Sequence, residues 1–382
     1  MLASYITIPA PRVLPRLRRR VRVRATDPDA ANAAAKVVAD SHAYKGTLVN
    51  GFTLHSPMVS MAMLRLGATA EQIEEQEKSA FEKNSRYGLL EVEGFDPAAE
   101  APTAETWTRF INGDEENELL LRRFWRASIR ERGRSESVGA CLAELWPGLQ
   151  SRLHHGPIRL AYASDDDEEE TAAALAAYCC NYRPPAALAA GPASASCLGA
   201  LEDLRLAFQE DMDIPKVIGG LGKKYAAYSS SSEFLRSLPT VASLSSDPDA
   251  SRDLLDCCLR FYLRKPGILT LHLVTGMHAL LVLREDFASH YGQALSAHYT
   301  SLACLFVAHK CPEIPKTPRP PRRKKGQTED TAGRGWEELT EVGLASKSDH
   351  DIKMVDTCLE LSKIYPEMEE ELLLPAARLI CK

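Results

Sequence analysis

Four histidines of this chain stand in short sequence contexts that could support chemistry: His55, His155, His272 and His350. An imidazole can bind a metal ion, and it can also act as an acid or a base near neutral pH. Lys353 follows the last of them by three residues, which on a helix places both side chains on one face. The spacing along the chain leaves open whether the four histidines converge in space.

The other six histidines are expected to have simpler roles. A histidine near a helix start more often caps the helix or makes a hydrogen bond than binds a metal. This role is expected for His42, His290, His298 and His309. His154 and His278 adjoin the stronger candidates, and they could orient a ligand ring through its second nitrogen.

The elements that must hold these residues are helices. Ser56 followed by Pro57 predicts a helix start, and Gly67 predicts its end. Thr69 with Gln72 forms a capping box that opens the next helix. Alternating runs of β-branched residues are nearly absent. We therefore expect a mainly α fold, with a single large helical bundle-like domain and long loops.

Two more helices are predicted from their own signals. Residues 115–130 carry Leu121, Trp125 and Ile129 at intervals of four, which is typical of an amphipathic helix. Ser348 and Asp351 have the spacing of a capping box, with Asp in place of the usual Glu.

The N-terminal segment 1–26 has a different composition from the rest. It contains seven arginines and no acidic residue, and the first carboxylate is Asp27. Such a leader is typical of a transit peptide for a plastid (chloroplast) or a mitochondrion, and a basic arm that binds nucleic acid is the alternative. Removing the seven arginines changes the formal net charge from −6 to −13, so residues 27–382 are acidic. This balance argues against a nucleic-acid partner.

Residues 311–334 form a second break in composition. They hold five prolines and a basic cluster, and we expect a surface linker or a disordered insertion there. The longest apolar stretches are interrupted well before the roughly 18 residues that a membrane span needs, so we expect a soluble protein without a membrane partner.

The cysteines and glycines exclude some familiar cofactor sites. No C-x-x-C occurs among the ten cysteines, and the adjacent pairs 179–180 and 257–258 lie in apolar stretches, so buried small hydrophobic residues are expected. The nearest approach to a phosphate-binding loop is the stretch 219–224, which lacks the terminal glycine of the dinucleotide fingerprint and the early glycine of a P-loop.

Four stretches of the chain resemble the questin oxidase-like family, known from fungal anthraquinone pathways and also found in bacteria and algae. They occur in the family's order, and the last two are the most specific. The four are 55–68, 155–162, 272–280, and Gly335-Trp336 followed by 349–353.

The resemblance implies an oxidoreductase that opens the ring of an aromatic polyketide by Baeyer–Villiger-like or dioxygenase chemistry. Family enzymes are described as NADPH-dependent, and at least one relative is a non-haem iron enzyme with four histidines and a carboxylated lysine. Carried over by position, the catalytic metal ligands are His55, His155, His272, His350 and Lys353. The chain departs from its relatives at Leu54, where Asn is common, and in the insertion 311–334.

The implied ligand set is chemically coherent. Neutral imidazoles suit Fe(II) but leave its double positive charge uncompensated. A desolvated lysine beside a cation loses its proton more readily, and the neutral amine of Lys353 can then take up carbon dioxide as an anionic carbamate. Dioxygen and a small phenolic aromatic molecule are the expected partners. Four aromatic residues could line a substrate pocket, although packing in the core is the simpler expectation for each of them: Tyr162, Tyr225, Tyr228 and Trp336.

Two other functions remain open from the sequence. The first is an NADPH-dependent, metal-free monooxygenase in which the histidines act as acids and bases. The second is a non-catalytic helical interaction protein. The sequence leaves the substrate, the metal, the oligomeric state and the organelle open.

Overall fold

The computed structural model describes residues 27–49, 51–92, 101–111, 117–163, 166–210, 212–246, 250–315 and 335–380. The predicted leader 1–26 and most of the predicted linker, residues 316–334, lie outside the described residues. Residues 311–315 contain neither helix nor strand.

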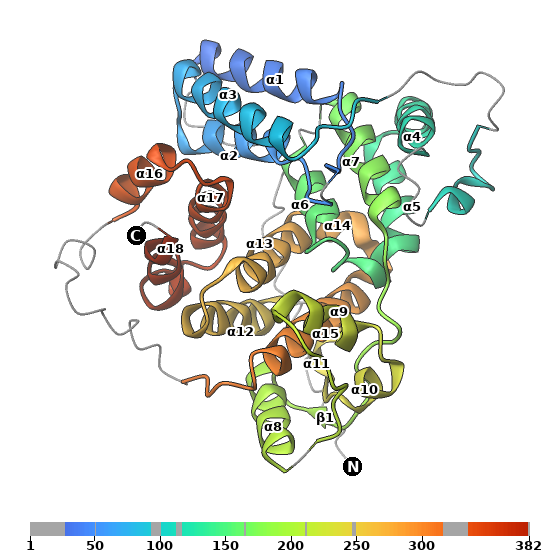
Figure 1. Cartoon of the computed structure of the whole chain (residues 1–382), viewed down its shortest axis with the longest axis vertical. Coiled ribbons are helices and arrows are strands. Elements are labelled where there is room, and N and C mark those ends of the chain that lie inside the picture. Colours follow the sequence, from blue (N-terminus) through green and yellow to red (C-terminus); the bar gives the residue numbers. More distant parts are fainter. Residues whose placement is uncertain are drawn as a thin grey trace, which may run out of the picture.

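The described chain is mainly helical, as the sequence predicts (Figure 1). Its α-helices are α1 Pro28–Ser41, α2 Ser56–Leu66, α3 Ala70–Arg86, α4 Glu118–Arg132, α5 Arg134–Leu145, α6 His155–Tyr162, α7 Glu168–Asn181, α8 Cys197–Gln209, α9 Leu221–Ser229, α10 Ser232–Ser237, α11 Ser243–Ser246, α12 Ala250–Arg264, α13 Ile268–Val282, α14 Arg284–Phe287, α15 Tyr291–Ala308, α16 Trp336–Ala345, α17 Asp349–Ile364 and α18 Leu374–Ile380.

The remaining elements are short. β1 (Ala193–Ser194) pairs in parallel with β2 (Thr240–Val241). Single turns of 3-10 helix and one π-helical turn complete the chain: Trp107–Phe110, Trp146–Gly148, Ala288–His290, Pro366–Met368 and the π-helical Glu369–Leu373.

The helix ends follow the predicted signals closely. Gly67 takes the left-handed φ of 85° that a glycine adopts readily, and it ends α2. The capping box of Thr69 and Gln72 opens α3. The start of α2 differs by one residue from the prediction, because His55 and not Ser56 is the N-cap, with Pro57 in the first turn.

The predicted capping box at the start of α17 is half correct. The Ser348 side chain accepts a hydrogen bond from the backbone N–H of Asp351, as expected. The Ser348 backbone N–H, however, donates to the Ser346 hydroxyl, and the Asp351 carboxylate accepts from that same hydroxyl. A residue upstream of the helix therefore replaces the second half of the box.

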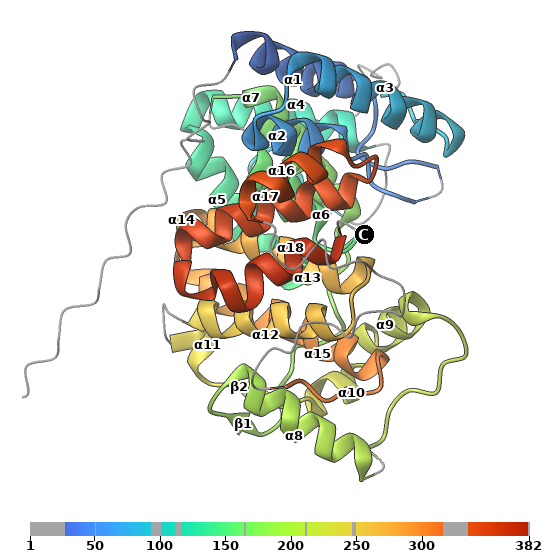
Figure 2. The ribbon, with the colours of Figure 1, turned by 90° about the vertical axis from the view of Figure 1, so that its left-hand side faces the viewer.

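The helices are arranged in layers, visible from two sides in Figures 1 and 2. α1, α2 and α3 pack together at one end, and α12, α15 and α8 lie toward the other. Between them, α6 and α13 pack against each other, and α17 packs on α2 and α13. Most of the buried apolar side chains form one continuous cluster, which runs from Ala30 to Ala377.

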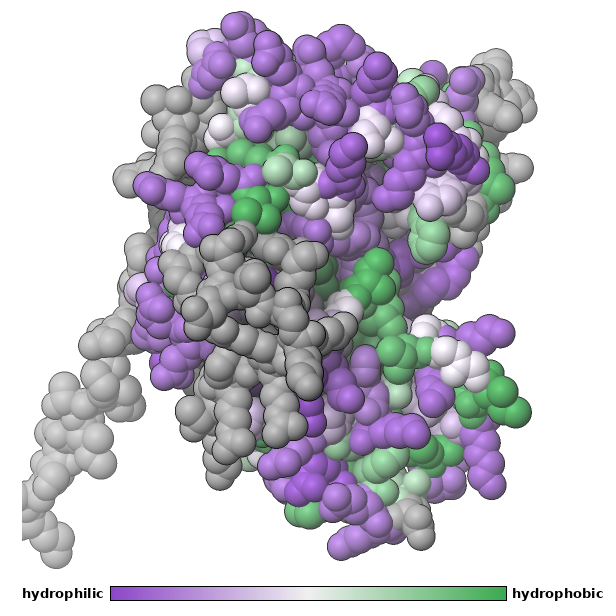
Figure 3. All heavy atoms as spheres, turned by 60° about the vertical axis from the view of Figure 1, so that its left-hand side comes forward, coloured by the Kyte–Doolittle hydropathy of each residue, from purple (hydrophilic) through white to green (hydrophobic). Residues whose placement is uncertain are grey.

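The surface is mostly polar on the face shown in Figure 3, where hydrophobic side chains emerge in small groups. None of the described helices has both the length and the apolar character that crossing a membrane would require.

Candidate metal centre

Four helices meet in a closed ring at the middle of the molecule. α2 contacts α6 and α17, and α13 contacts the same two helices. His55 is the N-cap of α2, His155 is the first residue of α6, and His350 is the second residue of α17. His272 lies in the second turn of α13. The ring of helices therefore brings together side chains that are up to three hundred residues apart in sequence.

The backbone before α6 is strained where it delivers His155. Three successive residues other than glycine take left-handed φ values: Arg152 (49°), Leu153 (58°) and His154 (64°). Such conformations cost free energy and concentrate at functional sites. The Arg152 side chain holds this turn by donating to the carbonyl of Gly51 at 2.6 Å and to the Asn181 side chain at 3.2 Å.

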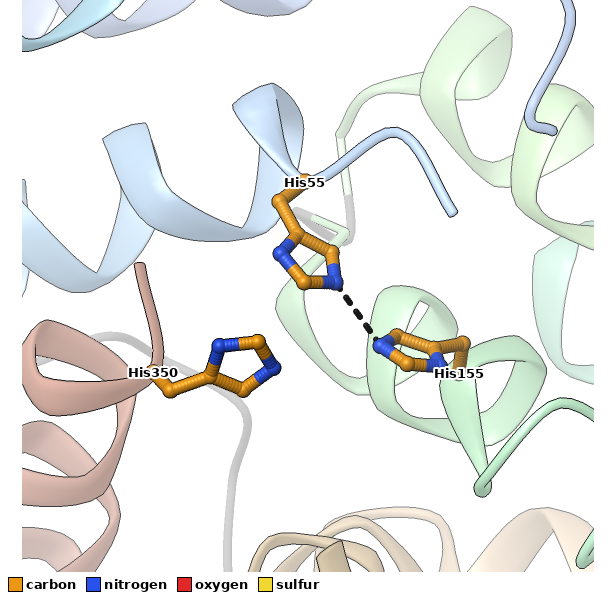
Figure 4. A group of neighbouring side chains, drawn as sticks. All are labelled: His55, His155 and His350. Atoms are coloured by element: carbon orange, nitrogen blue, oxygen red, sulfur yellow. Dashed lines mark hydrogen bonds between the residues drawn. The ribbon is translucent and has the colours of Figure 1, made fainter. Parts of the chain in front are cut away.

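The four imidazole rings lie against one another. The centroid of the His55 ring is 4.8 Å from that of the His155 ring and 4.9 Å from that of the His350 ring. His272 is 4.6 Å from His155 and 5.1 Å from His350 by the same measure. Ligand nitrogens of His55, His155 and His350 all lie within 4.8 Å of one another, and Figure 4 shows these three rings facing a common space.

The Nε2 atoms of three of the rings point at one another. The Nε2 of His155 is 2.8 Å from that of His55 and 3.2 Å from that of His272. In His155 and His272, the Nδ1 atom makes a hydrogen bond to a backbone carbonyl, a group that can only accept. His155 donates to the Arg152 carbonyl, and His272 donates to the Ile268 carbonyl at 2.6 Å. The proton of each neutral ring is therefore on Nδ1, and Nε2 carries a lone pair.

His55 follows the same pattern through a carboxylate. Its Nδ1 lies 3.2 Å from Oδ2 of Asp349. Burial disfavours the charged form of Asp349, but the hydrogen bond from His55 and the charges of Lys83 and Lys353 outweigh it and lower the pKa of this carboxyl to about 2. Three unprotonated nitrogens thus converge with no proton to share, an arrangement that a cation would stabilise.

The environment keeps the four imidazoles neutral. Burial is the largest cause, and it lowers the pKa of His55 to about 4 and that of His272 to about 3. The pKa values of His155 and His350 are also far below the usual range for histidine. The positive charge of Lys353 lowers all four further, and three of the rings sit at positive helix N-termini.

Lys353 is buried beside the rings. Its side chain is 1% exposed, and its Nζ has no hydrogen-bond partner within the part of the chain that the structure describes. The Nε2 of His350 likewise has none there. Burial lowers the pKa of Lys353 to about 8, partly offset by Asp349. The structure therefore brings all five predicted ligands into one neighbourhood. Two of their nitrogens, Nζ of Lys353 and Nε2 of His350, have no hydrogen-bond partner among the described residues.

The histidines predicted to have other roles lie in separate environments. His154 packs on His298 with ring centroids 4.7 Å apart, and both of its nitrogens lack a hydrogen-bond partner among the described residues. His154 therefore does not orient a ring of the centre through a hydrogen bond. Charges that influence His278 come from Arg65, Glu360 and Lys363, away from the four rings. The Nε2–H of His298 donates to the Leu273 carbonyl at 3.0 Å, as expected for a hydrogen-bonding histidine.

The four aromatic candidates for pocket walls behave as structural residues. The Tyr162 hydroxyl donates to Asp356 at 2.8 Å, and the Tyr225 hydroxyl lies 2.8 Å from that of Ser301. Tyr228 packs on Phe234, and Trp336 packs against the hydrophobic core.

Sequence reasoning missed two acidic residues around the centre. Asp349 was recognised only as part of a motif, although its position directly before His350 was a usable signal. No pattern in the sequence marks Glu77 of α3 as a site residue, because it comes close to Asp349 only through the packing of α3 on α2.

Comparison with known proteins identifies the family of the chain. No curated protein matches the chain significantly. The model of the questin oxidase-like family matches residues 52–358, a span that contains all five residues of the centre. The match covers most of the chain, so this protein belongs to the questin oxidase-like family, which marks it as an oxidoreductase.

Proposed function

We propose that this protein is an oxygen-dependent oxidase whose centre holds one Fe(II) ion and acts on a phenolic aromatic substrate. The residues that would hold the ion are His55, His155, His272, His350 and Lys353. The observation that carries the proposal is the convergence of three Nε2 lone pairs at 2.8 and 3.2 Å, each fixed by an acceptor at the opposite nitrogen. Protein metal sites use such acceptors to orient their histidines.

The donor set fits a divalent ion of intermediate softness. Imidazole nitrogens suit iron, and the ion when bound supplies the redox chemistry that allows dioxygen to react with an electron-rich phenol. Lys353 contributes the balancing charge. Its neutral amine adds to carbon dioxide and releases one proton, which leaves a carbamate anion.

The protein's own residues keep the ligands in the form that binds a cation. Asp349 and the carbonyls of Arg152 and Ile268 hold the Nδ1 protons. Burial of the rings excludes water and prevents their protonation near neutral pH. The same low pKa values disfavour the metal-free alternative, because a general acid or base works best with a pKa close to the operating pH.

Metal analysis tests the proposal. Protein produced with iron and purified without oxygen is expected to contain about one iron per chain, and His155→Ala and Lys353→Ala are expected to lose most of it. His290→Ala is the matched control, because His290 lies outside the centre beside Ser289. Circular dichroism of each variant establishes that it is folded. Full iron in folded His155→Ala, or no metal binding by the unaltered protein, would refute the proposal.

Cosubstrate use separates the remaining alternatives. Oxygen consumption with a phenol and without NADPH supports the iron oxidase. Consumption of NADPH by the metal-free protein supports the monooxygenase. A folded protein that binds no metal and consumes neither reagent supports the interaction protein.

A further inference from the structure

A cavity of about 620 Å³ opens beside the centre, between α1, α3 and the chain that leads into α2. We infer that this cavity binds the organic substrate as a flat, hydroxylated aromatic ring, with Glu77 and Ser56 holding the hydroxyl group. The inference rests on the proposed function, and it adds the location of the substrate and the residues that recognise it. The volume lies within the usual range for small-molecule sites.

The cavity adjoins the centre through shared residues. Leu54 and Ser56, the two chain neighbours of His55, both line it. Ser56 and Glu77 also line a second, water-sized hollow, which Asp349 lines as well. Asp349 is the carboxylate that holds Nδ1 of His55. The cavity is therefore lined by the chain neighbours of His55, and it shares Ser56 and Glu77 with the hollow that Asp349 lines.

The outer part of the cavity has an aromatic wall. Tyr44 and Phe81 both line it, and their rings meet edge to face with centroids 6.1 Å apart. Phe81 is 44% exposed, so its ring is accessible at the cavity. Exposed aromatic rings around an opening favour a flat aromatic ligand.

The inner part of the cavity is polar. The Oγ of Ser56 is buried beside the Glu77 carboxyl; it makes no regular hydrogen bond within the described ranges, but it is close enough to act on the pKa of that carboxyl. The Glu77 side chain is half-buried beside it and faces the cavity from α3, on the same helix face as Phe81 and Asn84. Burial raises the pKa of Glu77 to about 7, an effect that Ser56 partly opposes. A hydroxyl group placed here would give the carboxylate a donor and the serine a partner.

The walls are fixed before any ligand binds. The backbone N–H of Gly46 donates to both carboxylate oxygens of Glu118 at 3.0 Å. Arg122 donates to the carbonyl of Tyr44 at 2.5 Å, and the N–H of Leu54 donates to the carbonyl of Gly46 at 2.9 Å. The lining loop is therefore held by a buried acid and an arginine of α4, so binding needs little reorganisation.

A blocking substitution tests the location. Ala43 is exposed on the rim of the cavity, so Ala43→Trp should fold normally and fill the opening. Ala35→Trp is the matched control, because Ala35 is exposed on α1 and does not line the cavity. Binding of 2-naphthol to the iron-loaded protein, followed by fluorescence, is expected to weaken at least tenfold in Ala43→Trp and to be unchanged in Ala35→Trp.

A comparison of two ligands tests the recognition. Naphthalene lacks the hydroxyl group of 2-naphthol but has the same rings. Above about pH 8, where the Glu77 carboxyl with its pKa of about 7 is ionised, the unaltered protein should bind 2-naphthol about tenfold more tightly than naphthalene, a difference typical of one hydrogen bond to a charged acceptor. Glu77→Ala should remove most of this preference while leaving naphthalene binding unchanged. A preference that survives Glu77→Ala would overturn the role of Glu77.

Iron content is measured in the same samples, so that two failures can be told apart. Unchanged naphthol binding in iron-loaded Ala43→Trp would overturn the cavity assignment and leave the proposed iron oxidase standing. Weakened binding in Ala43→Trp with full iron supports the assignment. If the unaltered protein holds no metal, the proposed function fails, and the binding data still decide where the aromatic ligand lies.

Discussion

Asp356 gives the protein a titrating carboxyl group inside its core. It is fully buried on α17, and it accepts a hydrogen bond from Tyr162. Burial raises its pKa to about 7 against an ordinary value of 3.8, although nearby Arg65 works in the opposite direction. The folded chain therefore keeps a proton that the unfolded chain releases from about pH 4 upward.

The sign of the resulting pH dependence follows from this difference. Between about pH 4 and 7 the folded state binds more protons at Asp356 than the unfolded state, so this group lowers stability as the pH rises. Asp356→Asn removes the effect while keeping an acceptor for Tyr162. Urea unfolding should show the variant gaining roughly 1–3 kcal/mol over the unaltered protein between pH 5 and pH 8. A constant difference across this range would contradict the buried, protonated carboxyl.

Arg159 and Glu170 form a buried ion pair between α6 and α7. Two hydrogen bonds of 2.7 and 2.8 Å join them, and both side chains are at most 3% exposed. Arg159→Met would leave the Glu170 carboxylate buried with His42 as its remaining side-chain partner among the described residues, and should cost roughly 3–5 kcal/mol of unfolding free energy. Chemical denaturation measures this value.

A surface pair serves as the control for that substitution. Arg130 and Glu168 are 60% and 46% exposed in their ion pair. Arg130→Met should change stability by about 0.5 kcal/mol or less, because exposed pairs are screened by water. Equal losses in the two variants would show that the burial of the Arg159 pair has no energetic consequence.

Single residues also show which features of the structure the sequence could predict. The end of α2 at Gly67 and the start of α3 at Thr69 follow from local backbone requirements that the sequence displays directly. The hydrogen bond from His55 to Asp349 joins residues 294 positions apart, and the local sequence around either residue does not predict this partner. The five proposed ligands were named through family likeness, and their approach to one another is a property of tertiary packing.

Among the helices, the end of α2 offers a clean test of backbone strain. Gly67 has a φ of 85°, and a Cβ there would meet no atom within 4 Å. Gly67→Ala should therefore cost only the left-handed conformation, about 1–2 kcal/mol. The melting temperature and urea midpoint should both fall.

Gly222 on α9 is the matched control for that change. A Cβ at Gly222 also meets nothing within 4 Å, but its backbone is helical. Gly222→Ala should stabilise the protein by up to about 1 kcal/mol, because alanine favours helix. A loss of stability at both positions would mean that the conformation at Gly67 is not the cause.

The helical character of the segments and several helix ends were predictable from the sequence. The helices against which each of them packs were not. A repeat of apolar residues identifies a buried face, as for Leu121, Trp125 and Ile129 of α4, which are all buried. It does not identify which helix covers that face. The contacts of α2 with α6 and α17, on which the centre depends, arise only when the whole core assembles.

The protein as a unit should be stabilised by the metal it is proposed to hold. An ion that binds the folded state alone adds about 2.7 kcal/mol at a hundredfold excess over its Kd. Chelation should lower the melting temperature by a few degrees, and Fe(II) added without oxygen should restore it. His155→Ala should show no response to either treatment. An equal response in that variant would place the stabilising ion elsewhere.

The order of the proposed ligands along the chain has a consequence for biosynthesis. His55, His155 and His272 leave the ribosome well before α17, which carries His350 and Lys353. The growing chain therefore exposes only part of the donor set until α17 has been translated. The carboxylate of Asp349 that holds His55, and the lysine proposed to balance the charge of the ion, would thus join the centre only near the end of translation.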